Sequence, residues 1–443
     1  MDPYTTFQVP SGDRPKYTGK KLVMLSPGAS MKNIDEEAKE AALRLAPSGA
    51  YRKHEEDYLK AFEEGDGIVF EKFGVAVINA NNDEQIKSLV YARSSFQYEE
   101  PERYLYALDG PKSRNFAQVL WQLLCRLFGR KSDPPVPGPS PDPVDPLPVF
   151  ENNDEAYWGL HALAALDNTY TGKGVKLAVL DTGMYQAHPD FAGRNVVSKS
   201  FIPGEPVEDT NGHGTHCAGI AVGGRRGGTG ARYGAASEAD LYVAKVLSNE
   251  GVGSDSGILA GMEWAVNEGC KVISMSLGAS VEENTRYSSI YNELAGKAMD
   301  MGTLIIAAAG NDSRRRQGLI RPVNHPANCP NILAVGALDR RSQVADFSCG
   351  GLNADGGLVD IAGPGVEIFS SWKLPQEYAI LSGTSMATPF VAGVAAQFLE
   401  AFPEITAREL WDKLLAQARP VPLPSRDVGI GLVQSPQEVL EPS

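Results

Sequence analysis

The chain has 443 residues, of which 42% are hydrophobic and 22% charged, so it has a globular composition and enough length for more than one domain. Its formal net charge of −14 and its isoelectric point near 5.0 argue against a nucleic-acid partner and against binding to an anionic membrane surface.

Two further features bear on the compartment. Residues 1–17 have no basic start followed by an apolar core, so they do not resemble a Sec-type signal peptide, and no long apolar run of membrane-spanning length occurs. We expect a cytoplasmic protein, or one exported by a non-Sec route. Scattered cysteines without disulfide or metal-ligand spacing predict free, mostly buried thiols in a reducing compartment, at Cys125, Cys217, Cys270, Cys329 and Cys349.

The first part of the chain is predicted to be a flexible leader, residues 1–17, followed by a small α+β domain, residues 18–110. Alternating apolar residues predict strands at 20–25, at 67–79 on both sides of Lys72, and at 96–108. Helical periodicity predicts helices at 33–45 and 83–92. The order β-α-β-β-α-β is that of a ferredoxin-like fold.

Two segments connect this domain to the rest of the chain. Residues 111–131 contain a predicted amphipathic helix, in which Leu120, Leu124 and Leu127 recur with helical spacing beside a basic rim. Such a helix either docks on the protein body or binds a membrane surface or a partner. Residues 132–150 are too rich in proline for regular structure and are predicted to form an extended spacer.

Residues 151–443 alternate predicted strands with predicted helices. The strands are expected at 175–180, 241–246, 271–276, 304–309 and 332–337, and the helices at 215–222, 256–268, 287–301 and 384–402. This alternation predicts an α/β domain, in which a parallel sheet is sandwiched by helices. The active site is then expected at the carboxyl ends of the strands.

Three residues of this domain are suited to acyl transfer. Asp181 directly follows a predicted strand, His213 lies between two glycines, and Ser385 begins a predicted helix. At a helix start, free backbone N–H groups and the helix dipole favour a developing oxyanion. Each residue alone could be structural, but together they supply the nucleophile, base and orienting carboxylate of a catalytic triad.

The stretches around these residues resemble the three active-site signatures of the subtilisin-like serine proteases and follow that family's order. They are residues 181–183, 213–216 and 383–387, which read DTG, HGTH and GTSMA. The resemblance covers about residues 158–433, and Cys217 after the histidine signature is similar to the proteinase K branch. It implies a serine endopeptidase that hydrolyses peptide bonds through an acyl-enzyme.

The resemblance also implies roles for other residues. Asn311 would supply the side-chain amide of the oxyanion hole. Asn324 falls near the primary specificity pocket, whose preference the sequence leaves open. Two segments would flank an extended protein or peptide substrate as neighbouring strands, and their residues are Gly251, Val252, Gly253, Ser276, Leu277 and Gly278.

Residues 18–110 are similar to the inhibitor-type prodomains that precede many members of this family. The resemblance implies a zymogen that processes itself and is then inhibited by its own prodomain. We expect the closing strand, residues 100–108, to lie in the active-site cleft like a substrate, with self-cleavage near Leu108 or before Phe150. An independent small domain is the alternative interpretation.

A structural calcium ion is a common feature of the family, and Asp190 stands where many members use a carboxylate ligand. The loop at 223–234, which would complete the site, contains arginines and glycines, with side-chain oxygens only on Thr229 and Tyr233. Calcium prefers six to eight oxygen ligands. We therefore expect no cofactor and no metal, with a structural calcium ion as the alternative.

Two other functions are compatible with the sequence. A catalytically silent, protease-like module could bind peptides without cleaving them, and the same triad could hydrolyse esters. A fluorophosphonate probe separates the silent module from an enzyme, because it labels only an activated serine.

Overall fold

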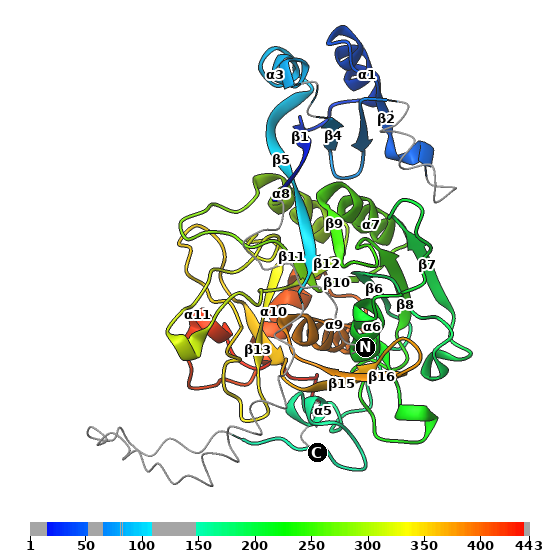
Figure 1. Ribbon diagram of the computed structural model, residues 1–443, viewed down its shortest axis with the longest axis vertical. Helices are drawn as coiled ribbons and strands as arrows, with labels where there is room; N and C mark the ends of the chain where they lie inside the picture. The colour runs from blue at the N-terminus through cyan, green and yellow to red at the C-terminus, as the bar shows by residue number, and fades with distance from the viewer. Residues whose placement is uncertain (1–15, 52–64, 80, 82, 109–147, 438–443) are drawn as a thin grey trace, which may run out of the picture.

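The computed structural model describes residues 16–51, 65–79, 81, 83–108 and 148–437 (Figure 1). Most of the predicted leader, the predicted helix within 111–131, most of the predicted spacer and Cys125 lie outside these residues. Among the helices of the described part, none is long and apolar enough to cross a membrane.

The N-terminal domain, described here for residues 16–108, is a sheet with the strand order β5-β1-β4-β3-β2, in which β1 is antiparallel to both β4 and β5. Alternation along β1 explains its two covered faces: Val23 and Leu25 pack with the helices, whereas Leu22 and Met24 pack toward the other domain. The elements are β1 (Tyr17–Leu25), α1 (Met31–Glu40), β2 (Leu45–Pro47), the 3₁₀ helix η1 (Ser48–Tyr51), β3 (Gly67–Phe70), β4 (Val75–Asn79), α3 (Asp83–Ala92) and β5 (Phe96–Ala107).

Three boundaries differ from the sequence predictions. The first helix ends at Glu40, because Ala42 takes a positive φ of 61°, and the chain continues into β2, where Leu45 pairs with Gly67 of β3. The prediction of a helix up to Leu45 was wrong at this end. Tyr17 already belongs to β1. Phe150, assigned to the spacer, donates its backbone N–H to Arg340 O at 2.8 Å.

The C-terminal domain, residues 148–437, is built on a parallel sheet, which confirms the predicted α/β fold. Its strand order is β14-β13-β12-β10-β6-β8-β7, and each neighbouring pair is parallel. The strands are β6 (Lys176–Asp181), β7 (Val196–Ser200), β8 (Asp240–Lys245), β10 (Val272–Met275), β12 (Leu304–Ala308), β13 (Leu333–Leu338) and β14 (Ile361–Pro364).

Helices cover both faces of this sheet, as Figure 1 shows. Along β6, Leu177 and Val179 join the core that contains α6, α9 and α10, while Ala178 and Leu180 join the core that contains α7 and α8. Both faces of the inner strands are therefore covered, which is typical of a parallel sheet, whereas the edge strand β7 is only partly buried. The helices are α5 (Trp158–Ala162), α6 (His213–Val222), α7 (Asp255–Asn267), α8 (Ser289–Asp300), α9 (Thr384–Ala401), α10 (Ala407–Gln417) and α11 (Ser425–Val428).

The strand β5 connects the two domains. Its first half pairs with β1, and its last residues enter the C-terminal domain between β9 (Val252–Ser254) and β11 (Leu277–Gly278), antiparallel to both (Figure 1). A hairpin of β15 (Ile368–Ser371) and β16 (Tyr378–Leu381) lies beside α6 and leads to α9. The N-terminal sheet and the helices α7 and α8 share one hydrophobic core.

Candidate active site

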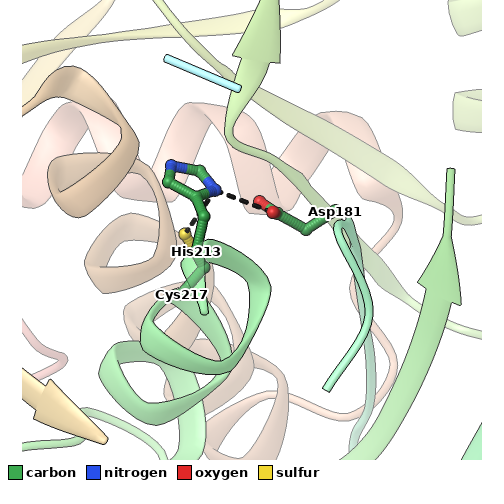
Figure 2. A group of neighbouring side chains, drawn as sticks. All are labelled: Asp181, His213 and Cys217. Atoms are coloured by element: carbon green, nitrogen blue, oxygen red, sulfur yellow. Dashed lines mark hydrogen bonds and ion pairs between the residues drawn. The ribbon is translucent and has the colours of Figure 1, made fainter. Parts of the chain in front are cut away.

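Asp181 and His213 form a buried pair at the carboxyl edge of the parallel sheet. Asp181 is the last residue of β6, and His213 begins α6 after Gly212, whose φ of 106° favours glycine. Both side chains are fully buried, and His213 Nδ1 lies 2.7 Å from Asp181 Oδ1 (Figure 2). The backbone N–H of Thr182 donates to the same oxygen at 2.7 Å, which holds the carboxylate in place.

The electrostatics of this pair suit a base that becomes a stabilised cation. Burial lowers the pKa of His213, but the Asp181 carboxylate outweighs it and holds the pKa well above its ordinary value. The neighbouring His216 is different, because burial together with the charge of His213 lowers its pKa to about 3. Of the two histidines, His213 is thus the one whose surroundings favour the protonated imidazole, whereas those of His216 favour the neutral form.

Ser385 and Asn311 meet at one carbonyl oxygen of the N-terminal domain. Ser385 Oγ lies 2.7 Å from the carbonyl oxygen of Leu108, and Asn311 Nδ2 donates to that oxygen at 2.5 Å. Asn311 Oδ1 accepts hydrogen bonds from the backbone N–H and the hydroxyl of Thr384, both at 2.9 Å. These bonds fix the amide so that its NH₂ group faces Leu108.

Cys217 lies beside the Asp181–His213 pair and close to Ser385. Its Sγ is 3.9 Å from His213 Nδ1 and 3.6 Å from the carbonyl oxygen of Ser385, so it fills the space between α6 and α9 (Figure 2). Burial raises the pKa of the thiol to about 11, which keeps it protonated and unreactive near neutral pH.

Ligand atoms of Asp181, His213 and Cys217 lie within 4.8 Å of one another, which is close enough to suggest a metal site. The nitrogen that faces the other two groups is Nδ1 of His213, and its short contact with Asp181 is that of a hydrogen bond. A metal there would displace this bond. Asp181 and His213 therefore fit the hydrogen-bonded pair of a catalytic triad better than they fit a metal centre with Cys217.

The two predicted substrate-flanking segments do flank an extended chain. Leu105 pairs with Gly253 and Tyr106 with Val252 on one side, and Ala107 pairs with Leu277 on the other. The backbone N–H groups of Ala107 and Leu108 donate to Gly251 O at 2.9 Å and to Ser276 O at 3.3 Å. Residues 104–108 therefore lie in this cleft in the manner of an added strand.

Asp209 is a site residue that the sequence reasoning missed. Its buried carboxylate accepts hydrogen bonds from the Thr182 hydroxyl at 2.9 Å, from Gly212 N at 2.8 Å, and from both the N–H and the hydroxyl of Thr215. It thereby connects the turn after Asp181 to the start of α6. Its position only four residues before His213 was the one sequence feature that could have suggested a role in this site.

Two carboxylates of β5 were also missed. Glu102 is fully buried and accepts from Ser256 N at 2.9 Å, in the first turn of α7. Glu100 accepts from the Ser288 hydroxyl at 2.6 Å and from Ile290 N at 3.2 Å, at the start of α8. Both groups satisfy free N–H groups and place negative charge at helix N-termini, where the helix dipole favours it.

The residues around Asp190 do not fit a calcium site. Its Oδ1 accepts from the Tyr378 hydroxyl and from Gly227 N, both at 2.9 Å, and its Oδ2 accepts from the Tyr233 hydroxyl at 2.8 Å. The Arg226 guanidinium lies over the Tyr378 ring, 5.5 Å from its centroid. Calcium needs several converging oxygen ligands, whereas here phenols, an amide and a cation surround one carboxylate.

The structure brings Ser385 and the Asn311 amide to one peptide carbonyl, and it places the Asp181–His213 pair at the carboxyl edge of the same sheet. These are the residue types that serine hydrolases of the triad class use. The model of the Subtilase family matches residues 172–431, and the chain belongs to this family.

Similar proteins agree with this assignment. Subtilisin-like protease 3 of Pseudogymnoascus destructans is 37% identical over 263 residues, which cover 55% of this chain and 59% of that protein. M-protease of Shouchella clausii is 42% identical over 243 residues, covering 54% and 58%, and Subtilisin Savinase of Lederbergia lenta is 41% identical over 243 residues, covering 54% and 82%. The match thus spans about three fifths of the length of the first two relatives.

Among solved structures, Sphericase aligns with a TM-score of 0.54 at 32% sequence identity, covering 62% of this chain and 97% of that chain. The shared part is of the size of the C-terminal domain alone.

Proposed function

We propose that the protein is a serine endopeptidase made as a self-processing zymogen. The observation that carries this proposal is the position of the Leu108 carbonyl oxygen, 2.7 Å from Ser385 Oγ and 2.5 Å from Asn311 Nδ2. A peptide carbonyl held between a serine hydroxyl and an amide donor is oriented for acyl transfer.

In the first half of the reaction, Ser385 Oγ attacks the carbonyl carbon of the bound peptide, and His213 accepts the hydroxyl proton. Asp181 stabilises the imidazolium that forms, and the Asn311 amide stabilises the oxyanion of the tetrahedral intermediate. The intermediate collapses when the carbon–nitrogen bond breaks and His213 gives its proton to the leaving amine. The product is an acyl-enzyme on Ser385 and a free amine.

In the second half, a water molecule gives a proton to His213 and attacks the ester carbonyl of the acyl-enzyme. The new oxyanion is stabilised by the same Asn311 amide. When the second intermediate collapses, the Ser385 oxygen takes the proton back from His213 and the peptide leaves as a carboxylic acid. Atoms and protons balance to the hydrolysis of one peptide bond.

The N-terminal domain acts as the inhibitory prodomain in this proposal. Leu108 is followed by Asp109 in the sequence, so the bond between them is the proposed processing site. After cleavage the strand β5 would keep its pairing with β9 and β11 and the contacts of Glu100 and Glu102. Inhibition would then outlast the first cut, since the released domain starts at high local concentration.

Extended proteins or peptides are the proposed substrates. Main-chain pairing accepts many sequences, while Leu105 is fully buried in the shared core, and burial of such a side chain contributes about 2 kcal/mol. The cleft therefore favours a large apolar residue three positions before the residue at 108.

The proposal includes no cofactor, and it places the protein in a reducing compartment. The four cysteines among the described residues are free and buried: Cys217, Cys270, Cys329 and Cys349. Buried unpaired thiols accord with such a compartment. Fractionation of cells that express the tagged chain, with a thiol-labelling readout, checks this part.

The test of the proposed function combines labelling and mass spectrometry. The wild-type chain should react with a fluorophosphonate probe at Ser385 after processing and yield an N-terminal fragment that ends at Leu108. Ser385→Ala should neither react nor process. A wild-type protein that stays intact and unlabelled, yet is folded by circular dichroism, would favour the silent peptide-binding module instead.

A further inference from the structure

Lys245 is a fully buried lysine at the carboxyl edge of the parallel sheet. It is the last residue of β8 and pairs in register with Asp181 of β6. The residues two positions earlier, Val179 and Val243, both join the core that contains α6, so the side chains of Asp181 and Lys245 leave the sheet on that same face. The lysine therefore starts beside the aspartate that holds His213.

Three oxygen acceptors surround the Lys245 ammonium group. Nζ lies 2.5 Å from Thr182 O, 2.9 Å from Asn249 Oδ1 and 3.3 Å from Glu205 Oε2. An ammonium group has three N–H donors, and each of the three acceptors can take one. A buried charge is tolerated when it is paired and hydrogen-bonded in this way, and the same contacts fix its position.

Thr182 connects Lys245 to Asp181. Its backbone N–H donates to Asp181 Oδ1 at 2.7 Å, and its hydroxyl donates to Asp209 Oδ1 at 2.9 Å. Its carbonyl oxygen accepts from Lys245. Three groups of this one residue are thus held by three charged side chains. A turn of the Thr182 carbonyl would also move the N–H that holds the Asp181 carboxylate.

Asn249 connects Lys245 to His213. Its side-chain oxygen accepts from Lys245, and its carbonyl oxygen accepts from Asn211 Nδ2 at 2.9 Å. Asn211 Oδ1 in turn accepts from the backbone N–H of His213 at 3.2 Å, at the first residue of α6. The lysine therefore reaches both members of the Asp181–His213 pair, each through a short chain of hydrogen bonds.

The charge of Lys245 opposes that of the carboxylates around the pair. The ionisable groups that act on His213 include the Asp181 carboxylate on β6 and, on its own helix, the Cys217 thiol and the His216 imidazole. The carboxylate favours the protonated imidazole, whereas a general base must be neutral at the working pH. A buried cation at this edge of the sheet favours the neutral imidazole and so counteracts the carboxylate.

We propose that Lys245 is a positioning residue for peptide hydrolysis, which holds Asp181 and His213 in their relative places and, through its charge, makes the imidazole release its proton more readily. It acts through Thr182 and Asn249 and by its field, not by contact with the reacting bond. The inference rests on the proposed protease function and adds a residue to its mechanism.

Lys245→Met keeps the unbranched stem of the side chain and removes the charge. For the processed enzyme on a chromogenic peptide, kcat should fall about tenfold and KM should change less than about twofold, because the pair is disturbed and the cleft is not. The acid limb of the pH–rate profile should move to higher pH by about one unit, as expected for a unit charge at roughly 10 Å and an effective dielectric constant near 20.

Lys176→Met is the matched control. This lysine begins the neighbouring strand β6, at the opposite end of the sheet, and its Nζ donates to Glu268 O at 2.9 Å. Its substitution should leave kcat and the acid limb unchanged.

Glu205→Gln tests the charge without depending on the folding of Lys245→Met. Its side chain is 22% exposed, and an amide oxygen can still accept from Lys245 and from Asn249 N. Loss of this negative charge should move the acid limb to lower pH by about half a unit, opposite to the shift in Lys245→Met.

The acid limb decides between a positioning and a merely structural role. Shifts in opposite directions support the proposal, since general damage to the fold would not reverse its sign with the charge removed. An acid limb that stays in place in Glu205→Gln, and in Lys245→Met where that variant folds, would overturn the role of Lys245 while the protease function stands. Absence of peptide hydrolysis by the wild type would overturn both.

Discussion

Besides the shared hydrophobic core, two sets of polar contacts along β5 join the N-terminal domain to the C-terminal domain, and they differ in chemistry. Residues 104–108 bind through main-chain pairing with β9 and β11 and through the contacts of one carbonyl oxygen with Ser385 and Asn311. Glu100 and Glu102 bind through side chains, which accept hydrogen bonds at the starts of α8 and α7. Any extended peptide can make the first set of contacts, whereas the second set needs carboxylates at two positions. Under the proposed function, this difference would separate an inhibitor from a substrate.

The largest expected effect concerns the first set of contacts. Ser385→Ala removes the nucleophile and keeps the strand pairing, so turnover of a chromogenic peptide should fall by about 10⁶-fold. Intact-mass measurement should find the chain uncut, with the prodomain still bound. Ser425→Ala, at the start of α11, is the control and should process normally. Turnover by Ser385→Ala near the wild-type level would refute the assignment.

Asp181→Asn should reduce kcat by about 10⁴-fold, since the amide can no longer stabilise the imidazolium or hold its tautomer. The substitution also removes the charge that raises the pKa of His213. Activity needs the neutral imidazole and is lost as pH falls through that pKa, so the acid limb of the pH–rate profile should move to lower pH. Asp167→Asn, at an exposed position, should leave the profile in place. An acid limb that stays or moves upward would contradict this electrostatic account.

Asn311→Leu should reduce kcat by about 100- to 1,000-fold with a smaller change in KM, because its amide contributes mainly to the charged intermediate. Steady-state kinetics on the processed enzyme provide the measurement. The substitution tests whether the Asn311 amide, which donates to the Leu108 carbonyl oxygen, stabilises the transition state of the reaction. A variant with raised KM and unchanged kcat would instead make Asn311 a binding residue.

Glu102→Ala tests the second set of contacts. Loss of a helix cap costs about 1 kcal/mol, so the prodomain should bind several-fold more weakly and the lag before peptide hydrolysis should shorten. The rate of hydrolysis after the lag should equal that of wild type, because Glu102 is far from the reacting bond in the strand. Glu84→Ala, on the exposed side of α3, is the matched control. An unchanged lag would show that strand pairing alone accounts for inhibition.

The smallest expected effect concerns Asp190. Removal of metal ions with a chelator should leave the melting temperature almost unchanged, since protein donors already satisfy this carboxylate. Tyr378→Phe removes one donor and should lower the free energy of unfolding by about 1 kcal/mol. Thermal scans with and without chelator and added calcium check both statements. A large drop with chelator, reversed by calcium, would reveal a metal site elsewhere.

The sequence predicted what depends on local patterns. The five predicted strands of the central sheet are mostly apolar runs, and the helix predicted at 384–402 is α9, Thr384–Ala401, because apolar and small residues continue along its whole length. The strands β7 and β14 and the hairpin of β15 and β16 were not predicted, since they are short and lack a long apolar run. The first helix was predicted to be too long because the spacing of Leu43 and Leu45 is compatible with both a helix and a strand.

Features that depend on distant partners could not be predicted. Glu102 and Ser256 are 154 positions apart, and Asp190 and Tyr378 are 188 apart, so no local pattern relates either pair. Asn324 could be placed near the pocket by resemblance, but its orientation depends on Asp312 and on the Gly310 backbone. Such contacts follow from the folded topology alone.

The short strands that receive β5 have a consequence for self-association. If the N-terminal domain is released, as the proposed function requires, β9 and β11 become open edges of 3 and 2 residues. Open edges are sites where chains of different molecules join into larger sheets, and short ones limit that process. In the proposed protease, another copy of the chain could offer an extended loop to these edges and be cut there, whereas edges this short offer few pairing positions for copies that join edge to edge. At high concentration we expect loss by mutual digestion before fibrous aggregation.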